Sequence, residues 1–267
     1  MQMRAVIVGV ALVLGCSMAA SAQQAASPAE PVLGQKGKDV QWVPTPQLLL
    51  EKMLDMAAVT PKDYLVDLGS GDGVTVIAAA RRGVRALGIE YDANLVAVSR
   101  RNAKAAGVEK RVRFKRADIF KTDFSKATVV TTFLLPSLNL QLRPTILAMK
   151  PGTRVVSNTF PMGEWEPDDT VEIEGPCERW CKALFWVVPA RVGGAWRAGT
   201  RELTLTQKFQ FVTGTLGDAP IEDGRLRGAD LTFRVGASTY RARVFEYRIE
   251  GTVETGGTSS RWSAVRR

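Results

Sequence analysis

Tyr64-Leu65-Val66-Asp67-Leu68-Gly69-Ser70-Gly71-Asp72-Gly73 is the stretch that decides the fold of this 267-residue chain. Its apolar first half predicts a buried β-strand, its glycines predict a tight turn, and residues 74–82 follow as a helical run. Glycine is needed in such a turn because a backbone without Cβ atoms can bend sharply and come close to a ligand. Strand, glycine turn and helix in this order predict a βα unit that binds a nucleoside.

A second carboxylate strengthens this interpretation. Val84 to Ile89 is another apolar strand pattern, and it ends in Glu90, about 20 residues after the glycine turn, where a carboxylate can accept both ribose hydroxyls. A dinucleotide site usually reads G-x-G-x-x-G, whereas this turn reads G-x-G-x-G and has Asp67 two residues before its first glycine. Because a carboxylate there suits a cationic ligand, the spacing disfavours a nicotinamide-dependent oxidoreductase.

Further segments extend the pattern. They are the strand pattern 112–116 followed by Asp118, the apolar run Thr128 to Leu135, a helical pattern through Leu147, and the turn Lys150-Pro151-Gly152 before residues 153–156. In their order these segments resemble the class I S-adenosylmethionine-dependent methyltransferases. Together with strands and helices that alternate through about residue 160, the resemblance implies an α/β fold, a doubly wound Rossmann-like sheet that binds its ligand at the carboxyl ends of the first strands.

The resemblance implies S-adenosyl-L-methionine as the cofactor. Asp67 and the backbone of the glycine turn would hold its methionine portion, Glu90 its ribose, and Asp118 with Ile119 its adenine. The full set of implied cofactor-binding residues is Asp67, Gly69, Ser70, Gly71, Gly73, Glu90, Asp118 and Ile119. For each of the three carboxylates the alternative is a loop-capping or turn role.

No residue is predicted to act as a catalytic acid or base. Methyl transfer from a sulfonium is an in-line displacement, so an enzyme mainly has to align donor and acceptor and exclude water. The chain contains no histidine, which excludes a histidine base and the usual Ser-His-Asp and Cys-His arrangements. No metal site is predicted either, because a zinc site would need carboxylates in place of histidine.

Four segments are similar to the small protein-lysine methyltransferases related to the mitochondrial ATP synthase c-subunit enzyme. They are residues 43–46 (VPTP), 67–73 (DLGSGDG), 133–137 (FLLPS) and 160–165 (FPMGEW). This similarity implies a protein lysine as the methyl acceptor. The chain departs from these relatives at Val74, where they often carry arginine, and after about Pro176, in a part that they do not have.

Phe133, Leu134 and Pro136 are the residues assigned to the acceptor. Enzymes that methylate amide or exocyclic nitrogens often place Asn/Asp-Pro-Pro-aromatic after the fourth strand, and this chain has FLLPSLN at 133–139, which argues against a nucleobase amine. An apolar collar would lower the pKa of a lysine by desolvation and so favour its reactive neutral amine. The same residues could equally be ordinary core at the end of a strand.

The pattern changes after Trp186. Short alternating runs separated by Gly-, Asp- or Ser-containing turns replace the helical periodicity and predict a small antiparallel β meander or barrel. The predicted domains are a signal peptide (1–22), a flexible tether (23–40), an S-adenosylmethionine-binding methyltransferase domain (41–176) and an antiparallel β domain (177–267). Aromatic side chains are expected to fill the core of the last one: Trp186, Trp196, Phe209, Phe211, Phe233, Tyr240, Phe245 and Trp262.

The first residues have the layout of a bacterial secretory signal. An apolar run at 5–15 follows Arg4, and Ala20-Ser21-Ala22 offers a cleavage site after Ala22, which predicts an exported, periplasmic protein with an uncleaved membrane anchor as the alternative. Cleavage would leave Cys177 and Cys181. In an oxidising compartment these could form a disulfide, and free thiols on an ordinary turn are the other interpretation.

The net charge and the predicted export both affect which binding partners are expected. The net charge of +9 favours acidic partners such as an anionic membrane surface, but the basic residues between 100 and 116 are interpreted as a solvated face rather than as a nucleic-acid surface. S-adenosylmethionine is made in the cytosol while the signal points outward, so a second hypothesis is an exported non-catalytic nucleoside-binding or scaffold protein with a β adhesion module. Asp67, Glu90 and Asp118 favour the methyltransferase acting on a protein lysine, because a scaffold does not need both acidic strand ends.

Overall fold

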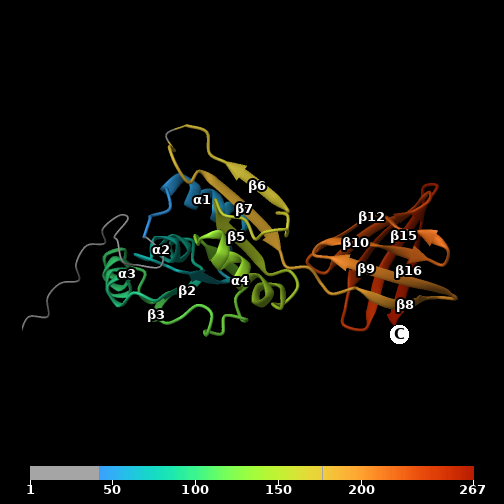
Figure 1. The fold of residues 1–267 in the computed structure, drawn as a ribbon, viewed down its shortest axis with the longest axis horizontal. Helices are drawn as coiled ribbons and strands as arrows, with labels where there is room; N and C mark the ends of the chain where they lie inside the picture. Colours follow the sequence, from blue (N-terminus) through green and yellow to red (C-terminus); the bar gives the residue numbers. More distant parts are fainter. Residues whose placement is uncertain (1–41, 176) are drawn as a thin grey trace, which may run out of the picture.

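The computed structural model describes residues 42–175 and 177–267, which form two β-sheets with separate cores (Figure 1). The predicted signal peptide and tether, residues 1–40, lie outside the described residues. None of the described helices is long and apolar enough to cross a membrane.

The first sheet has seven strands in the order β3-β2-β1-β4-β5-β7-β6. Its parallel strands are β1 (Tyr64–Leu68), β2 (Arg85–Glu90), β3 (Val112–Arg116), β4 (Val129–Thr132) and β5 (Arg154–Asn158). Two further strands extend the sheet in antiparallel pairing, β7 (Lys182–Val187) and β6 (Asp169–Glu172). The strand order reverses on either side of β1, so a ligand crevice is expected at the carboxyl ends of β1 and β4.

Helices cover both faces of this sheet, and the doubly wound α/β fold is confirmed. One face carries α1 (Gln47–Met56), α2 (Val74–Arg81) and α3 (Ala93–Ala105), and the other carries α4 (Pro136–Leu147). Successive residues of a strand point to opposite faces. Accordingly, Leu65 of β1 joins the core under the first three helices, and Val66 joins the core under α4.

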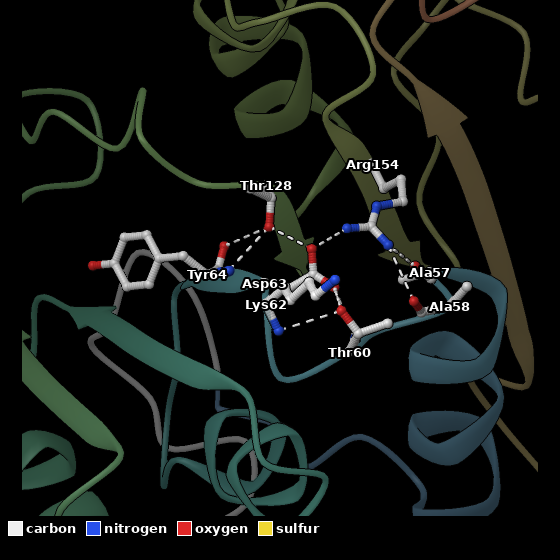
Figure 2. Close-up of polar contacts among 8 residues, drawn as sticks. All are labelled: Ala57, Ala58, Thr60, Lys62, Asp63, Tyr64, Thr128 and Arg154. Atoms are coloured by element: carbon white, nitrogen blue, oxygen red, sulfur yellow. Dashed lines mark hydrogen bonds and ion pairs between the residues drawn. The ribbon is translucent and has the colours of Figure 1, made fainter.

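A polar network ties together the amino ends of three parallel strands (Figure 2). The Asp63 carboxylate, just before β1, accepts hydrogen bonds from Thr128 Oγ1 at 2.8 Å and from the Arg154 guanidinium. Arg154, the first residue of β5, also donates to the Ala57 carbonyl at 2.6 Å. Burial alone would raise the pKa of Asp63, but these donors and Thr60 hold it below its usual value. The network fixes the edge of the sheet opposite the carboxyl ends.

The second sheet has nine antiparallel strands, and pairing of β9 with β10 closes eight of them into a barrel. Its strands are β8 (Gly194–Ala198), β9 (Arg201–Lys208), β10 (Phe211–Leu216), β11 (Ala219–Pro220), β12 (Glu222–Arg227), β13 (Asp230–Val235), β14 (Ser238–Val244), β15 (Arg248–Thr255) and β16 (Thr258–Arg266). The short β11 pairs with the end of β10. The predicted small antiparallel β unit is confirmed.

The sequence predicts that the β domain starts at residue 177. In the structure, the change from the first sheet to the second lies later in the chain. β6 and β7 complete the first sheet, and the first strand of the second sheet begins at Gly194. β7 runs back along β5, with Asn158 opposite Ala183. This pairing satisfies backbone groups that would otherwise form an open sheet edge, which is a physical reason for β7 to belong to the first unit.

The aromatic residues expected in the barrel core divide between the two units. Trp186 lies in β7 and is buried in the first unit, against which Phe209 also packs. Trp196, Phe233 and Tyr240 are buried in the barrel. Trp262 and Phe211 are partly buried, whereas Phe245 is 39% exposed.

The two units touch at several places, among them a short segment that precedes β6. The ring of Phe209, between β9 and β10, stacks on Trp165 with centroids 6.2 Å apart. Arg225 of β12 forms an ion pair with Asp168 at 2.9 Å. In Figure 1 the barrel, in orange and red, lies at one end of the molecule beyond the chain that follows β7.

Candidate active site

The carboxyl ends of β1 and β2 bring the glycine turn and Glu90 together. The amides of Gly69 and Ser70 donate to the carbonyl of Ile89 at 2.9 and 3.0 Å, and the amide of Gly71 donates to Glu90 Oε2 at 2.9 Å. The turn that follows β1 is therefore bound to the end of β2 by both backbone and side-chain contacts.

Two glycines of the turn have conformations and surroundings that exclude a side chain. Gly71 and Gly73 have φ values of 53° and 84°, in the left-handed region that residues with a Cβ rarely adopt. A Cβ on Gly71 would lie 2.8 Å from the indole of Trp42, and one on Gly73 would lie 2.8 Å from the ring of Phe114. The turn thus has no side chain at these two positions, and Trp42 and Phe114 pack directly against its backbone.

Glu90 is half-buried and is held by two backbone amides. Its Oε2 accepts from Gly71 and its Oε1 accepts from Asp92, each at 2.9 Å. Asp92 in turn caps α3 by accepting from the Asn94 amide at 2.8 Å. A carboxylate has about four acceptor positions, so Glu90 keeps acceptor capacity on each oxygen for the hydroxyl groups of a ligand.

Asp67 lies near the end of β1 and is only 6% exposed, and Thr131 Oγ1 of β4 donates to its Oδ1 at 2.7 Å. Burial raises the pKa of Asp67 to about 7, the carboxylates of Glu90 and Asp72 add to the rise, and the hydrogen bond from Thr131 opposes it. Burial also raises the pKa of Asp72. Three carboxylates around one glycine turn give this edge a negative potential, which suits a cationic ligand.

Asp118 and Ile119 follow β3, on the far side of β2. The chain is held there by the Ala117 amide, which donates to the Glu90 carbonyl at 2.9 Å. Asp118 Oδ1 accepts from the Phe120 amide at 2.9 Å, and Ile119 is half-buried. Asp118 therefore caps its own turn, one of the two roles that the sequence left open, at the same edge of the sheet as Glu90.

On the other side of β1, the residues after β4 form an apolar wall. Leu134 is buried, and its Cδ2 lies 2.9 Å from the position that a Cβ on Gly69 would take, so it packs directly on the glycine turn. Phe133 is half-buried, with its ring centroid 6.0 Å from that of Phe160. Pro136 is exposed at the first position of α4. Phe133 and Leu134 thus lie at the edge that carries the carboxylates.

Three aromatic residues at this edge escaped the sequence interpretation: Trp42, Phe160 and Trp180. Trp42 lies before α1 and reaches the glycine turn only through folding. Trp180 precedes β7, and its ring centroid lies 5.4 Å from that of Phe160 because β7 runs antiparallel to β5. A signal existed only for Phe160, which opens the segment 160–165 already singled out for its similarity.

The site also contains buried oxygen atoms that the described residues do not satisfy. Ser70 Oγ in the turn and Thr132 Oγ1 at the end of β4 are buried and have no hydrogen-bond partner within residues 42–175 and 177–267. A buried hydroxyl without a partner costs about 1–3 kcal/mol. Carboxylates, bare glycine backbone and unsatisfied hydroxyls together fit S-adenosylmethionine, a ligand with a sulfonium, an amine and ribose hydroxyls.

Comparison with known proteins finds relatives of the first unit. Residues 67–169 match a family described as the ANTKMT methyltransferase domain. The protein-lysine N-methyltransferase of Saccharolobus islandicus (strain REY15A) is 38% identical over 138 residues, which are 51% of this chain and 86% of that protein. The lysine N-methyltransferase that acts on the ATP synthase c-subunit in Mus musculus is 41% identical over 107 residues, which are 40% of this chain and 43% of that enzyme.

A solved structure is similar as well. The RNA methyltransferase from Salinibacter ruber, crystallised with S-adenosyl-L-homocysteine, is 49% identical, with a TM-score of 0.53 over 56% of this chain and 96% of that one. The chain spans about half the length of the ATP synthase lysine N-methyltransferases that it matches. The family match ends at residue 169, before β7 and the barrel, so this match concerns the first unit and its carboxyl-edge site.

Proposed function

The chain belongs to the S-adenosylmethionine-dependent methyltransferases with an ANTKMT methyltransferase domain, and we propose that it methylates the ε-amine of lysine in a protein. The observation that carries the proposal is the composition of the carboxyl edge, which has carboxylates at the ends of β1 and β2 and an apolar wall after β4. This chain covers 86% of the Saccharolobus islandicus relative. That protein is named a protein-lysine N-methyltransferase, which supports a lysine acceptor.

S-adenosylmethionine, when bound, would supply a methyl group whose carbon a nucleophile can attack, with a neutral thioether as the leaving group. We assign its methionine portion to Asp67 and the glycine-turn backbone, its ribose to Glu90, and its adenine to Asp118 with Ile119. The acceptor capacity left on Glu90 supports the ribose assignment. The burial of Asp67 supports the first assignment, because a charge is attracted more strongly in a medium of low dielectric constant.

Phe133 and Leu134 have the chemistry that a lysine acceptor needs. Lysine reacts as a neutral amine, after its ammonium has lost a proton to water, and an apolar wall favours that form by lowering the pKa of the ammonium. The amine nitrogen then forms the N–C bond while the C–S bond breaks and sulfur keeps the electron pair. The positive charge passes from sulfur to nitrogen, so alignment by the site matters more than a strong base.

A nucleobase acceptor is the competing possibility, because the similar solved structure is that of an RNA methyltransferase. The residues after β4 read FLLPSLN and provide no Asn/Asp-Pro-Pro-aromatic segment to hold an exocyclic amine. The apolar wall therefore favours lysine, and RNA serves as the comparison substrate in the test.

The test combines cofactor binding with product analysis. Calorimetric titration of the purified chain with S-adenosylhomocysteine should give binding that Glu90→Ala weakens by at least about tenfold, the loss of one or two hydrogen bonds to a charged group. Glu172→Ala is the matched control, because it removes an exposed carboxylate of β6 far along the sheet from β2, and it should bind like wild type.

Incubation with S-adenosylmethionine and either a lysine–alanine copolymer or total RNA then identifies the acceptor. Acid hydrolysis and mass spectrometry should find methyllysine in the copolymer and no methylated nucleoside. Methylated RNA with an unmodified copolymer would overturn the lysine assignment, and a folded chain that binds no S-adenosylhomocysteine would overturn the assigned cofactor site.

A further inference from the structure

Three aromatic side chains from separate parts of the first unit meet at the carboxyl edge of its sheet. Phe133 follows β4, Phe160 follows β5, and Trp180 precedes β7. Their ring centroids are 6.0 Å apart for Phe133 and Phe160, 5.8 Å for Phe133 and Trp180, and 5.4 Å for Phe160 and Trp180. All three are half-buried, so the cluster keeps ring surface open to solvent.

The cluster adjoins the apolar wall of the site. Phe133 is the neighbour of Leu134, which packs on the glycine turn, and β4 pairs directly with β1, with Leu68 opposite Thr132. The carboxylates of Glu90, the last residue of β2, and Asp118, after β3, lie on the opposite side of β1. The carboxyl edge is therefore polar on one side of β1 and aromatic on the other.

The backbone around Trp180 is constrained. Trp180 has a φ of 62°, a left-handed value that is uncommon for residues other than glycine and persists only where the surroundings enforce it. A disulfide between Cys177 and Cys181 closes the loop that contains it, and the Cys181 carbonyl accepts from the Ile173 amide at 2.9 Å. Strained backbone of this kind concentrates at functional sites, where it holds a side chain in place.

We infer that Phe133, Phe160 and Trp180 form a collar that receives the ε-nitrogen of the acceptor lysine, and that the Cys177–Cys181 disulfide positions Trp180 in it. This inference rests on the proposed lysine methyltransferase function. In the transfer, positive charge passes from the cofactor sulfur to the lysine nitrogen, and ring faces attract a cation at that nitrogen. One such ring changes an equilibrium by roughly two- to thirtyfold. The collar therefore favours charge transfer to nitrogen without a basic side chain, whereas desolvation by the buried Leu134 disfavours charge on the free lysine.

Substitutions at Trp180 test the collar through kinetics. Trp180→Leu should lower kcat/KM for the lysine–alanine copolymer by about tenfold, mainly through kcat because the ring attracts charge that appears at nitrogen only during transfer, and Trp180→Phe should restore most of it because a ring face returns. Affinity for S-adenosylhomocysteine should stay within about twofold of wild type in both, which would show that the site is folded. Phe245→Leu, at a 39% exposed aromatic of the barrel, is the matched control and should leave the kinetics unchanged.

The disulfide is tested on the same assay. The Cys177→Ser/Cys181→Ser variant should lose activity to a lesser extent than Trp180→Leu. A dithiol reductant, which is oxidised to its own disulfide as it converts the two cysteines to thiols, should bring wild type to the same level and leave the double variant unchanged. Wild-type kinetics in Trp180→Leu would overturn the collar. A reductant effect of equal size in wild type and in the double cysteine variant would overturn the role of the disulfide.

A binding measurement separates the collar from the proposed reaction. In the presence of S-adenosylhomocysteine, NMR titration should show that N-acetyl-trimethyllysine amide binds at least about threefold more tightly than its neutral tert-butyl isostere, and that Trp180→Leu abolishes the difference. Equal binding of the two probes by wild type would refute the collar even if the copolymer is methylated. Discrimination between the probes without methylation of the copolymer would retain the collar and refute lysine transfer.

Discussion

Asp67 is a buried carboxylate beside two others, Glu90 and Asp72, and burial raises its pKa to about 7. The unliganded protein therefore holds it partly protonated near neutral pH, whereas a cationic ligand calls for its ionised form. Folding favours the protonated form of this carboxyl, whereas ligand binding favours the ionised form. Such a conflict is common where a binding site reduces stability.

The affinity for S-adenosylmethionine should depend on pH through Asp67. As the pH falls below about 7 the carboxyl gains a proton, so affinity should fall by up to about tenfold per pH unit and should level off above that value. Titrations at about pH 6 and about pH 8 measure the effect, and Asp67→Asn should bind weakly at both. Equal wild-type affinities at the two pH values would contradict the assignment of the methionine portion to Asp67.

The stability of Asp67→Asn shows whether this variant is folded. The pKa of Asp67 in the folded state lies above the ordinary value of 3.8, so its contribution to stability is fully present below that value and is lost as the pH rises through about 7. Asp67→Asn removes the buried charge and keeps an oxygen for Thr131. It should therefore raise the free energy of unfolding at about pH 8 by on the order of 1–3 kcal/mol, measured by urea denaturation.

Local sequence signals pointed to the carboxylates proposed for the cofactor and to Phe133, but not to the other two aromatic residues of the proposed collar. Asp67 and Glu90 stand at the ends of apolar strand patterns around a glycine turn, so a short window contains the whole signal. Phe160 and Trp180 become neighbours only because β7 pairs with β5, a contact between distant residues. Asp118 shows a further limit, because its residue type suits a cofactor ligand and a turn cap equally, and the structure records the cap.

Across the strands of the first sheet, Asp63 connects elements that are far apart in the chain (Figure 2). Asp63→Ala would leave the Arg154 guanidinium, 22% exposed, without its carboxylate, and should lower the free energy of unfolding by about 2–4 kcal/mol. Glu109→Ala, at an exposed position, is the control and should change it by less than about 0.5 kcal/mol. Urea unfolding at neutral pH measures both. Equal values would mean that the network contributes nothing to the sheet.

The Asp63 network also has a defined pH dependence. Its donors hold the pKa of Asp63 below the usual value of 3.8, so its contribution to stability is present above that value and is lost as the pH falls through the lower folded-state pKa. The difference in stability between wild type and Asp63→Ala should accordingly narrow in acid. The contribution of Asp63 to stability is thus lost in acid, whereas that of Asp67, at the other edge of the same sheet, is lost as the pH rises.

Strands with a clear alternation of apolar residues could be predicted, and strands defined by their neighbours could not. β9 and β13 alternate buried and exposed positions, and they belong to the short alternating runs from which the antiparallel β domain was predicted. β16 (Thr258–Arg266) is mostly exposed and polar, and its place is fixed by pairing with β15 along its length and by contact with β8. Closure of the barrel through β9 and β10 is likewise a property of pairing rather than of either strand alone.

The barrel contacts residues 160–168, a segment that begins with Phe160 of the proposed collar. Phe160 opens residues 160–168, and this segment continues through Trp165, which stacks on Phe209, to Asp168, which pairs with Arg225. The family match ends at residue 169, directly after this segment. The second unit thus contacts the segment that begins at Phe160, and the strength of that contact can be measured.

Arg225 tests how firmly the two units are joined. Its guanidinium lies 2.9 Å from Asp168 Oδ1, and the Asp168 side chain is only 2% exposed, with its other oxygen accepting from the Val187 amide at 2.9 Å. Arg225→Ala leaves this buried carboxylate with one fewer donor, which should cost about 1–3 kcal/mol. Calorimetry should show one cooperative transition for wild type and two for Arg225→Ala, because the barrel and the first unit have separate cores.

The matched control for Arg225 is Arg243, which forms an exposed pair with Asp230 inside the barrel at 2.9 Å. Arg243→Ala removes the same kind of side chain without touching the contact between the units, and exposed pairs contribute little, so its melting profile should match that of wild type. A single unchanged transition in both variants would mean that the remaining contacts, among them the stack of Phe209 on Trp165, hold the units together without the buried ion pair. Two transitions in Arg225→Ala alone would identify the Asp168–Arg225 pair as the contact that makes the two units unfold together.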